Sequence, residues 1–448
     1  MPIIKSKPLS GFPELLPEEQ IVYQGVLDTI REEYERCGFC QIETPAVERR
    51  ETLVSKGGNE KEIYALSRLA ASSDGNADTD LALHFDLTVP LARYVAMYQG
   101  ELTFPFRRYQ IQKVWRGERA QSGRYREFHQ CDIDVIGRGK LAMITDAEIP
   151  SIICNIFRKL SLGKFTIRIN NRKILTGYCE YIGIEKEQRT SVMQIIDKLE
   201  KIGEDNVKVE LQNYAGISTE QAGHMIVFLG KACNTDDMIA FLQEQEMGET
   251  FARGCEELQE VVKGMRSFGV PEEYFCIDLT IARGLDYYTG TVYETVLTEH
   301  PELGSVCSGG RYDDLAMQFS DEKFPGVGIS IGVTRLIVPL LQSGIVATKT
   351  STPATVLVTT MDATYMDQYI KFATQLRDAH INTEIYLASK KIGDQLKYAH
   401  RKGFPIVLIA GENEIVKEIV QIKDMSSGEA VNKTYTEIVP YITELMQK

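Results

Sequence analysis

The chain has 448 residues, of which 43% are hydrophobic and 25% are charged, as is usual for folded globular proteins. At about 150 residues per domain, this length predicts roughly three domains. The net charge of −13 excludes a small basic nucleic-acid-binding module but leaves room for a local basic surface. No apolar run reaches the roughly 18 residues of a membrane-spanning helix. The first residues lack an apolar signal segment, so we expect a cytoplasmic protein with no membrane contact.

Helix and strand patterns in the first 170 residues predict a sheet with one open face. Residues 17–36 carry apolar side chains at helical spacing, and a short strand follows at 39–44. Residues 67–80 are small and polar, which predicts an exposed loop. Further strands are predicted at 81–89, 109–116 and 127–136, and a further helix at 146–159. Because polar and apolar residues alternate in these strands, we expect a mostly antiparallel sheet.

The pattern changes between residues 171 and 253, where helical segments such as 186–203 and 219–229 dominate. Strand patterns return at 274–281 and 291–297. Residues 326–341 then read as a strand, a glycine and a helix. The helical stretch therefore interrupts a region of strands and is a candidate inserted domain.

Residues 343–353 are small and polar with a proline at the end, which predicts a linker. Strands and helices alternate after it, as is typical of an α/β domain. The predicted order is strand 355–360, helix 367–379, strand 383–386, helix 391–402 and strand 405–410.

Polar residues on one predicted strand form the first candidate site. In residues 127–136, every second side chain is polar or aromatic and points to one face, namely Phe128, Gln130, Asp132 and Asp134. Cations crowd the neighbouring segment 107–126, namely Arg107, Arg108, Lys113, Arg116, Arg119, Arg124 and Arg126. Because arginine binds phosphate in a bidentate way, this hairpin suits a ligand with phosphates and an amine. A salt-bridged surface hairpin is the alternative.

Three further arginines stand next to a glycine or within three residues of one. Arg283 follows an apolar strand, so we expect its side chain at a strand end, close to Tyr287 and Tyr288. Arg311 follows a Gly-Gly pair, which often marks only a turn. Arg335 lies in the first turn of a predicted helix, where a cation opposes the helix dipole. A bound anion would resolve that conflict, and an exposed arginine beside a carboxylate is the alternative.

Cations also gather on and beside the predicted helix 391–402. They are Lys390, Lys391, Lys397, Arg401 and Lys402. Such a run usually marks a solvated helix face. A surface that contacts phosphates is the alternative.

Together these segments resemble the class II aminoacyl-tRNA synthetases, and specifically the histidyl-tRNA synthetase family. Residues 17–45, 115–128 and 328–335 are similar to the three motifs that define the class. Residues 283–290 and 308–313 are similar to two histidine-specific motifs. The resemblance extends over nearly the whole chain.

The resemblance implies a discontinuous α+β catalytic domain with a mostly antiparallel sheet, at residues 1–170 and 254–345. It implies a helical insertion domain at 171–253 and a C-terminal α/β anticodon-binding domain at 353–448. It also implies a homodimer, with residues 17–45 at the interface.

The resemblance further implies roles for individual residues. Histidine would contact Asp86, Leu87, Thr88, Arg116, Gln130, Asp134, Arg283, Tyr287 and Tyr288. Asp134 and Tyr288 would recognise the imidazole, while Asp86, Thr88 and Gln130 would hold the α-amino group. ATP would contact Arg116, Glu118, Arg124, Phe128, Arg311 and Arg335, and Arg283 and Arg116 would be the catalytic residues. Cations of the basic helix would contact tRNA.

The implied reaction is that of a histidine–tRNA ligase. ATP, with Mg²⁺, would activate L-histidine to histidyl-adenylate and pyrophosphate, and the histidyl group would pass to the 3′ end of tRNA(His). No fixed metal site on the protein is expected. The main alternative is a catalytically silent paralogue that serves as a regulatory subunit in histidine biosynthesis, although such relatives typically lack the anticodon-binding domain. One departure from the family pattern is Thr334, which stands where glutamate is frequent.

Overall fold

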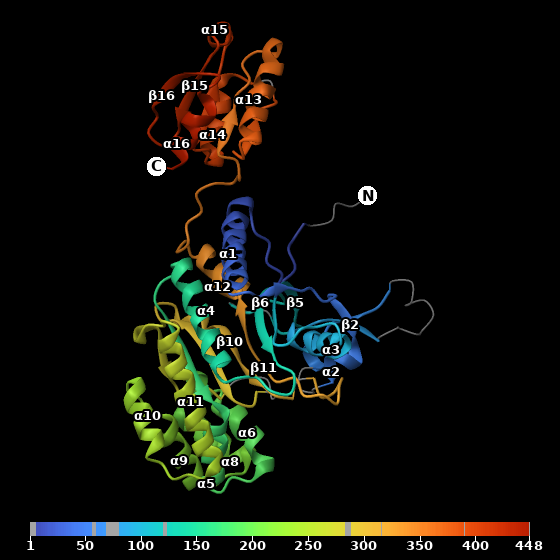
Figure 1. Cartoon of the computed structure of the whole chain (residues 1–448), viewed down its shortest axis with the longest axis vertical. Helices are drawn as coiled ribbons and strands as arrows, with labels where there is room; N and C mark the ends of the chain where they lie inside the picture. Colours follow the sequence, from blue (N-terminus) through green and yellow to red (C-terminus); the bar gives the residue numbers. More distant parts are fainter. Residues whose placement is uncertain are drawn as a thin grey trace. The chain divides into compact units, whose positions relative to one another are not determined.

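The computed structural model describes residues 6–55, 60–68, 80–119, 123–282, 288–314, 316–388 and 390–447. These residues form two compact units (Figure 1). The larger unit comprises the described residues up to Pro13 together with Val26–Ser343, and it is built on an eight-stranded sheet. The smaller unit comprises Glu14–Gly25 and Gly344–Lys448, and it has a five-stranded sheet of its own.

The eight-stranded sheet has the order β1-β5-β6-β11-β10-β9-β7-β8. Its strands are β1 (Cys40–Gln41), β5 (Phe106–Trp115), β6 (Glu127–Ile136), β7 (Phe165–Asn171), β8 (Phe275–Ile277), β9 (Thr291–Leu297), β10 (Ser305–Tyr312) and β11 (Gly326–Gly332). Only the outer pairs β1–β5 and β7–β8 are parallel among these strands. The predicted mostly antiparallel sheet is therefore confirmed. The strands predicted at 39–44 and 274–281 are shorter than expected.

Helices pack on the apolar face of this sheet. They are α4 (Ile144–Leu160), α11 (Glu249–Ser267), α12 (Val333–Gln342) and the part of α1 (Pro17–Arg36) from Val26 onward. Cys131, Ile133 and Val135 of β6 are buried, and Tyr34 of α1 donates a hydrogen bond to the carbonyl oxygen of Cys131 at 2.9 Å. Burial of each large aliphatic side chain stabilises the fold by roughly 1.5–3 kcal/mol, which fixes the register of β6. Its polar residues are thereby turned to the opposite face.

The chain between β1 and β5 forms a separate small sheet of three strands, in the order β2-β4-β3. Its strands are β2 (Val47–Arg49), β3 (Ala65–Leu66) and β4 (Leu81–Leu83), and its helices are α2 (Arg50–Val54) and α3 (Thr88–Tyr98). The strand predicted at 81–89 is wrong beyond Leu83. Asp86 Oδ1 accepts the backbone N–H of Val89 at 3.1 Å, so the chain turns into a helix there. Residues 69–79 of the predicted loop lie outside the described residues.

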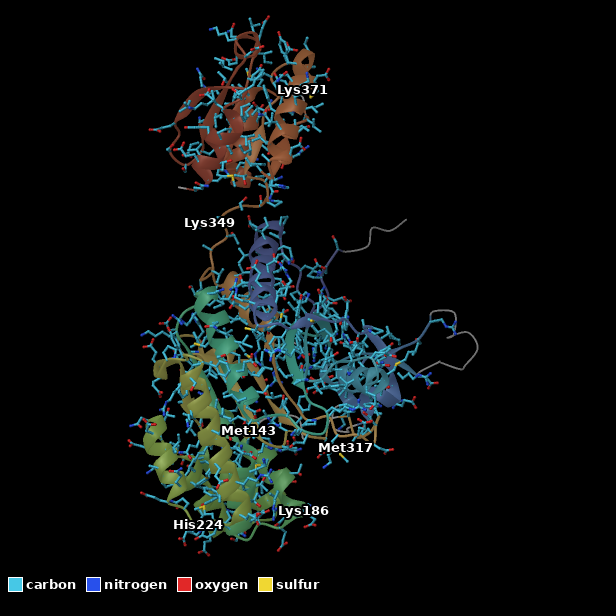
Figure 2. The ribbon with its side chains drawn as sticks, viewed as in Figure 1. Met143, Lys186, His224, Met317, Lys349 and Lys371 are labelled. Carbon is cyan, nitrogen blue, oxygen red and sulfur yellow. The ribbon has the colours of Figure 1, made fainter. Side chains whose placement is uncertain are left out.

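Helices alone make up the chain between β7 and α11. They are α5 (Arg172–Tyr181), α6 (Lys186–Ile196), α7 (Leu199–Ile202), α8 (Glu204–Ala215), α9 (Thr219–Leu229) and α10 (Thr235–Gln243). Their core includes the stacked rings of Tyr178 and Phe228, whose centroids are 3.9 Å apart. Lys186 and His224 lie at the surface of this group of helices (Figure 2). The helix predicted at 186–203 is interrupted after Ile196.

The smaller unit has the strand order β13-β12-β14-β15-β16. Its strands are β12 (Val356–Val358), β13 (Thr383–Ile385), β14 (Ile406–Ile409), β15 (Ile419–Asp424) and β16 (Ala430–Thr434), and its helices are α13 (Met366–Asp378), α14 (Ile392–Lys402), α15 (Glu412–Val416) and α16 (Ile438–Met446). The first three strands are parallel to one another, and β15 and β16 are antiparallel. The predicted alternation of strands and helices is confirmed through β14. Among the helices that the structure describes, none has the length and apolar character to cross a membrane.

Candidate active site

Two adjoining cavities lie on the face of the main sheet that carries the polar residues of β6. The larger has a volume of about 480 Å³ and the smaller of about 250 Å³. Both are lined by Arg116, Gln130, Ser305, Ser308, Ser330 and Arg335. The shared residues make the two cavities one continuous site.

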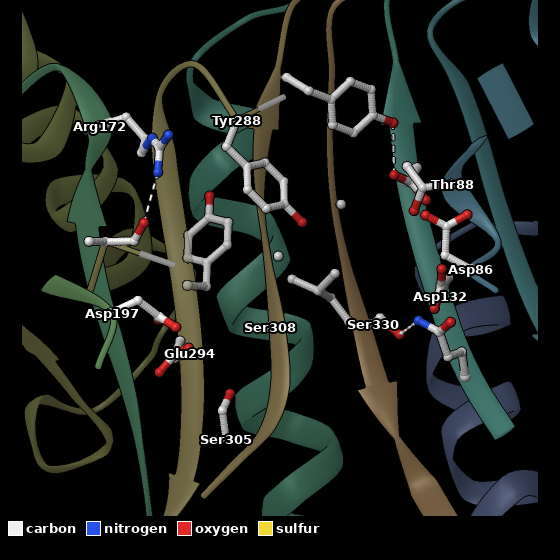
Figure 3. Close-up of a pocket in the computed structure, with 18 of the residues that line it drawn as sticks. Asp86, Thr88, Asp132, Arg172, Asp197, Tyr288, Glu294, Ser305, Ser308 and Ser330 are labelled. Atoms are coloured by element: carbon white, nitrogen blue, oxygen red, sulfur yellow. Dashed lines mark hydrogen bonds between the residues drawn. The ribbon is translucent and has the colours of Figure 1, made fainter. Parts of the chain in front are cut away.

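One wall of the larger cavity is acidic. Asp132 and Asp134 reach it from β6, and Asp86 reaches it from the N-terminus of α3. In Figure 3, Asp86, Thr88 and Asp132 lie together on this wall, with Ser330 beside them. The opposite wall carries Asp197, Glu294 and Ser305, and the ring of Tyr288 lies between the two walls (Figure 3). The alternation predicted for residues 127–136 is the reason why three polar side chains of β6 meet the same cavity.

The carboxylate of Asp134 is held from two sides. The Tyr312 hydroxyl donates a hydrogen bond to Asp134 Oδ1 at 2.7 Å, and Arg108 Nη2 lies 2.6 Å from Oδ2. Arg108 is 0% exposed and sits opposite Asp134 in the antiparallel pair β5–β6. A Cβ atom at Gly328 would lie 2.1 Å from Asp134 Oδ1. Glycine at this position of β11 therefore leaves the space that the Asp134 side chain occupies.

Burial changes the acid strength of this wall. It raises the pKa of Asp86 to about 6, against the opposing effect of the Val89 N–H and of Arg116. Burial, with the nearby charges of Asp134 and Asp86, raises the pKa of Asp132 to about 7, although Arg108 and a hydrogen bond from Ser330 act against this shift. The pKa of Asp134 is also raised by burial, with Arg108 and Tyr312 acting against the shift. The wall thus favours a ligand that brings positive charge or donors.

The smaller cavity is rich in arginine. Arg116 donates from Nε to the carbonyl oxygen of Phe85 at 3.1 Å, and its guanidinium lies 5.1 Å from the ring centroid of Phe128. Arg124 pairs with Glu118 at 3.0 Å, and both line this cavity. Arg335 lies in the first turn of α12, as predicted, and donates to the carbonyl oxygen of Leu303 at 2.8 Å. Three guanidinium groups around one cavity suit a phosphate ligand.

Other predicted site residues either lie away from the two cavities or fall outside the described residues. Arg311 is buried on the other face of β10, where it pairs with Asp146 of α4 at 2.6 Å, so its expected contact with ATP is not supported by its position. Leu87 is fully buried, and its side chain does not line either cavity. Arg283 and Tyr287 lie outside the described residues. The basic helix α14 belongs to the smaller unit, where Lys402 bonds to Glu384 and Tyr398.

Sequence reasoning placed Asp132 and Arg108 in the polar hairpin of the first candidate site but gave neither an individual role, and it did not identify Tyr312 or Ser330 as site residues. The alternation of β6 already turned Asp132 toward the site, and its position between Gln130 and Asp134 was the available signal. Ser330 lies opposite Asp132 in the pair β11–β6 and accepts a hydrogen bond from Gln130 at 2.8 Å. Thr334, the departure from the family pattern, accepts the backbone N–H of His129 at 2.9 Å and so ties α12 to β6.

Comparison with known proteins decides the family. The family profile of histidyl-tRNA synthetase matches residues 11–336, and that of the anticodon binding domain matches residues 354–445. The chain belongs to the histidyl-tRNA synthetase family. A histidine–tRNA ligase of Clostridium tetani is 47% identical over 443 residues, which cover 98% of this chain and 98% of the relative.

Solved structures agree with this membership. The crystal structure of histidyl-tRNA synthetase from Nostoc sp. PCC 7120 matches with a TM-score of 0.90 and 46% identity, and covers 99% of this chain and 100% of that one. A protein from Bacillus halodurans C, described as an ATP phosphoribosyltransferase regulatory subunit/histidyl-tRNA synthetase, has a TM-score of 0.72 at 21% identity over 89% of this chain and 97% of that one, and shows the fold alone. Membership in the histidyl-tRNA synthetase family confirms the predicted fold class. It also confirms an ATP-dependent histidine–tRNA ligase in preference to a regulatory paralogue.

Proposed function

We propose that the larger cavity binds histidine, that the smaller cavity binds ATP, and that histidyl-adenylate forms where the two join. The observation that carries this proposal is that Arg116 and Arg335 line both cavities. A carboxylate from one side and a phosphate from the other would meet at guanidinium groups, which bind both. The acidic wall would then lie at the amino and imidazole ends of the amino acid.

The imidazole would bind between Asp134 and Tyr288. A neutral imidazole donates from one ring nitrogen and accepts at the other. The Asp134 carboxylate is an acceptor, and the Tyr288 hydroxyl can donate. Because Tyr312 and Arg108 already hold Asp134, the acceptor is preorganised for the ring.

Activation would proceed by positioning and charge neutralisation. The histidine carboxylate would attack the α-phosphorus of ATP, the bond from that phosphorus to the oxygen bridging to the β-phosphate would break, and pyrophosphate would leave with that oxygen. Mg²⁺, when bound with ATP, would neutralise part of the phosphate charge. Arg116 would neutralise charge at the reacting phosphate, together with Arg283. Phe128 would pack against the adenine ring, and Arg124, Glu118 and Arg335 would contact the rest of ATP. The ribose hydroxyl at the tRNA 3′ end would then attack the acyl group.

Pyrophosphate exchange into ATP, with each of the twenty amino acids supplied in turn, tests this proposal. Exchange with histidine alone is expected. Absence of exchange in folded protein that still binds histidine would contradict the proposed activation step.

The remaining predictions from the family concern partners and organisation. We propose that tRNA(His) contacts Lys390, Lys391, Lys397 and Arg401, because Lys397 and Arg401 are exposed on α14. Lys402, the fifth predicted contact, is bonded to Glu384 and Tyr398 and would contribute less. We also propose that the protein is a homodimer and that it is cytoplasmic. Light scattering on the purified protein would test the dimer. The catalytic, insertion and anticodon-binding domains would keep the predicted bounds of 1–170 with 254–345, 171–253 and 353–448.

A further inference from the structure

We propose that Asp132 is a further binding residue for the amino acid substrate, and that it accepts a hydrogen bond from the α-ammonium group together with Asp86 and Gln130. The inference rests on the proposed histidine site and adds a residue to it. It starts from three acceptor atoms that the fold leaves without donors.

The three acceptors line the same cavity. Asp132 Oδ1, Asp86 Oδ2 and Gln130 Oε1 are buried and accept no hydrogen bond from the residues that the structure describes. Asp132 as a whole is 2% exposed. A buried carboxylate oxygen without a donor is costly, so a donor from the cavity would stabilise it strongly. An ammonium group has three N–H donors and so matches this set in number and in charge.

The charges around Asp132 point to a cation rather than a neutral donor. Asp86 and Asp134 both lie close enough to raise its pKa, whereas Arg108 is the cation that opposes them. Arg108 already contacts Asp134 Oδ2 at 2.6 Å. The wall therefore carries three carboxylates, Asp86, Asp132 and Asp134, against the guanidinium groups of Arg108 and Arg116. One added positive charge would reduce the repulsion between Asp86 and Asp132.

The spacing along β6 separates the two ends of the ligand. Asp132 and Asp134 are two residues apart on one strand, which places them roughly 7 Å apart along it. This distance is comparable with the reach of histidine from its ammonium group to its ring. Asp134 would then serve the imidazole, while Asp132, which lies beside Asp86 and Thr88 in Figure 3, would serve the ammonium group.

The test compares two ligands on two variants. Dissociation constants for L-histidine and for 3-(imidazol-4-yl)propionate, which lacks the amino group, are measured by ligand-observed NMR titration. We expect Asp132→Asn to raise the dissociation constant of L-histidine by roughly 10- to 100-fold, the range of one charge-assisted hydrogen bond. The dissociation constant of the analogue should change by less than about twofold. Asp134→Asn is the matched control on the same strand, and it should raise the dissociation constants of both ligands.

The outcomes show whether Asp132 binds the ammonium group of the substrate. Equal weakening of both ligands by Asp132→Asn, or no weakening of L-histidine, would overturn the inference. Failure of the unmodified protein to bind L-histidine would instead overturn the proposed function. If Asp132→Asn does not fold, calorimetry of the unmodified protein at pH 7 in two buffers of different ionisation enthalpy provides the test. Binding of L-histidine should release more protons than binding of the analogue, and equal release would count against Asp132.

Discussion

The position of Arg311 on β10 determines which partner its guanidinium group contacts. On β10 it alternates with Gly310 and Tyr312, so its guanidinium points to α4 while Tyr312 points to the cavity. It contacts Asp146 with both Nε and Nη2, and Nη2 also reaches the carbonyl oxygen of Ala142 at 3.3 Å. A buried ion pair of this kind holds the sheet and the helix in register. Its position favours a structural role over contact with ATP.

Loss of this pair should reduce stability rather than ATP binding. We expect Arg311→Met to lower the free energy of unfolding by about 3–5 kcal/mol, because Asp146 would be left buried without its cation. The KM for ATP in the folded protein should stay within about twofold. Urea unfolding and pyrophosphate exchange measure the two effects. Adding Asp146→Asn to Arg311→Met should recover part of the stability, whereas a stable single variant with a KM for ATP raised more than about tenfold would show that Arg311 serves ATP after all.

The sequence predicted the residues of one strand better than those of its neighbours. Alternation along 127–136 put Gln130 and Asp134 on one face, and both line the cavity. The same rule gave no face for Arg311, because the Gly-Gly pair before it suggested a turn instead of a strand interior. Arg108 was visible only as one cation among seven, since pairing with Asp134 depends on the register between two strands.

At the scale of elements, glycines on β11 open the space in which the site residues lie. Gly328 stands beside Asp134, and a Cβ atom at Gly326 would lie 2.4 Å from the Tyr312 ring. On β10, a Cβ atom at Gly310 would lie 2.9 Å from the Tyr288 ring. The strands thus carry glycine where neighbouring strands carry large polar side chains. This arrangement links sheet packing directly to recognition of the substrate.

Gly328→Ala should therefore act on histidine and not on ATP. The added methyl group would displace the Asp134 carboxylate, so we expect the KM for histidine to rise by roughly tenfold or more, with the KM for ATP changed less than about twofold. Pyrophosphate exchange measures both constants. Gly223→Ala in α9 is the control, since a Cβ atom at Gly223 would have no described atom outside its own helix backbone within 4 Å. An unchanged KM for histidine would show that β11 can shift to accept the methyl group.

The bounds of helices and strands were predicted correctly only where the sequence pattern is long and regular. The bounds of α1 and β6 match the predictions because each has a long, regular period. The strand predicted at 81–89 gives way to α3, where Asp86, two residues before the helix, accepts the backbone N–H of Val89, and the apolar run hid that change. The antiparallel hairpin of β15 and β16 was not predicted, since the last segment follows no alternation of strands and helices.

Helix α14 should contribute to tRNA binding through its exposed cations. Lys397 has 77% of its side chain exposed, whereas Lys402 is engaged by Glu384. Neutralising Lys397 and Arg401 to alanine should raise the KM for tRNA several-fold and reduce the slope of log affinity against log salt by about 1–2. Aminoacylation at several salt concentrations measures both. The matched control is the double alanine variant of Lys371 in α13, which is labelled in Figure 2, and Lys417 at the end of α15; both are exposed. Equal effects from both pairs would rule out a specific role for α14.

At the scale of the whole molecule, stability and binding meet at the acidic wall. The fold buries carboxylates on the face of the sheet that also forms the cavity, and burial raises the pKa of Asp132 to about 7. In the unfolded chain the pKa of aspartate is about 3.9. The folded state therefore binds more protons than the unfolded state between about pH 4 and pH 7, and this part of the stability is lost as the pH rises through about 7. The site is built at a cost to the protein without ligand.

Asp132→Asn should remove that cost. We expect the variant and the unmodified protein to be similar in stability near pH 4, and the variant to be more stable at pH 8 by on the order of 2–4 kcal/mol. Arg108, Asp86 and Asp134 face Asp132 in both proteins, and burial raises the pKa of Tyr34, Cys131 and Cys307 nearby, so these three stay neutral over this range. Urea unfolding at pH 5, 6, 7 and 8 measures the difference. A variant that is less stable at every pH would show that the Asp132 carboxylate stabilises the fold.

Repeating the unfolding at pH 8 with saturating L-histidine joins this prediction to the proposed role of Asp132. A ligand that binds only the folded state stabilises it in proportion to the logarithm of its affinity. If the ammonium group pairs with Asp132, L-histidine should stabilise the unmodified protein more than the Asn variant, and the advantage of the variant should shrink or reverse. 3-(Imidazol-4-yl)propionate should leave the advantage unchanged, because it brings no ammonium group to the wall. Equal stabilisation of both proteins by L-histidine would mean that the ammonium group of the substrate does not pair with the Asp132 carboxylate.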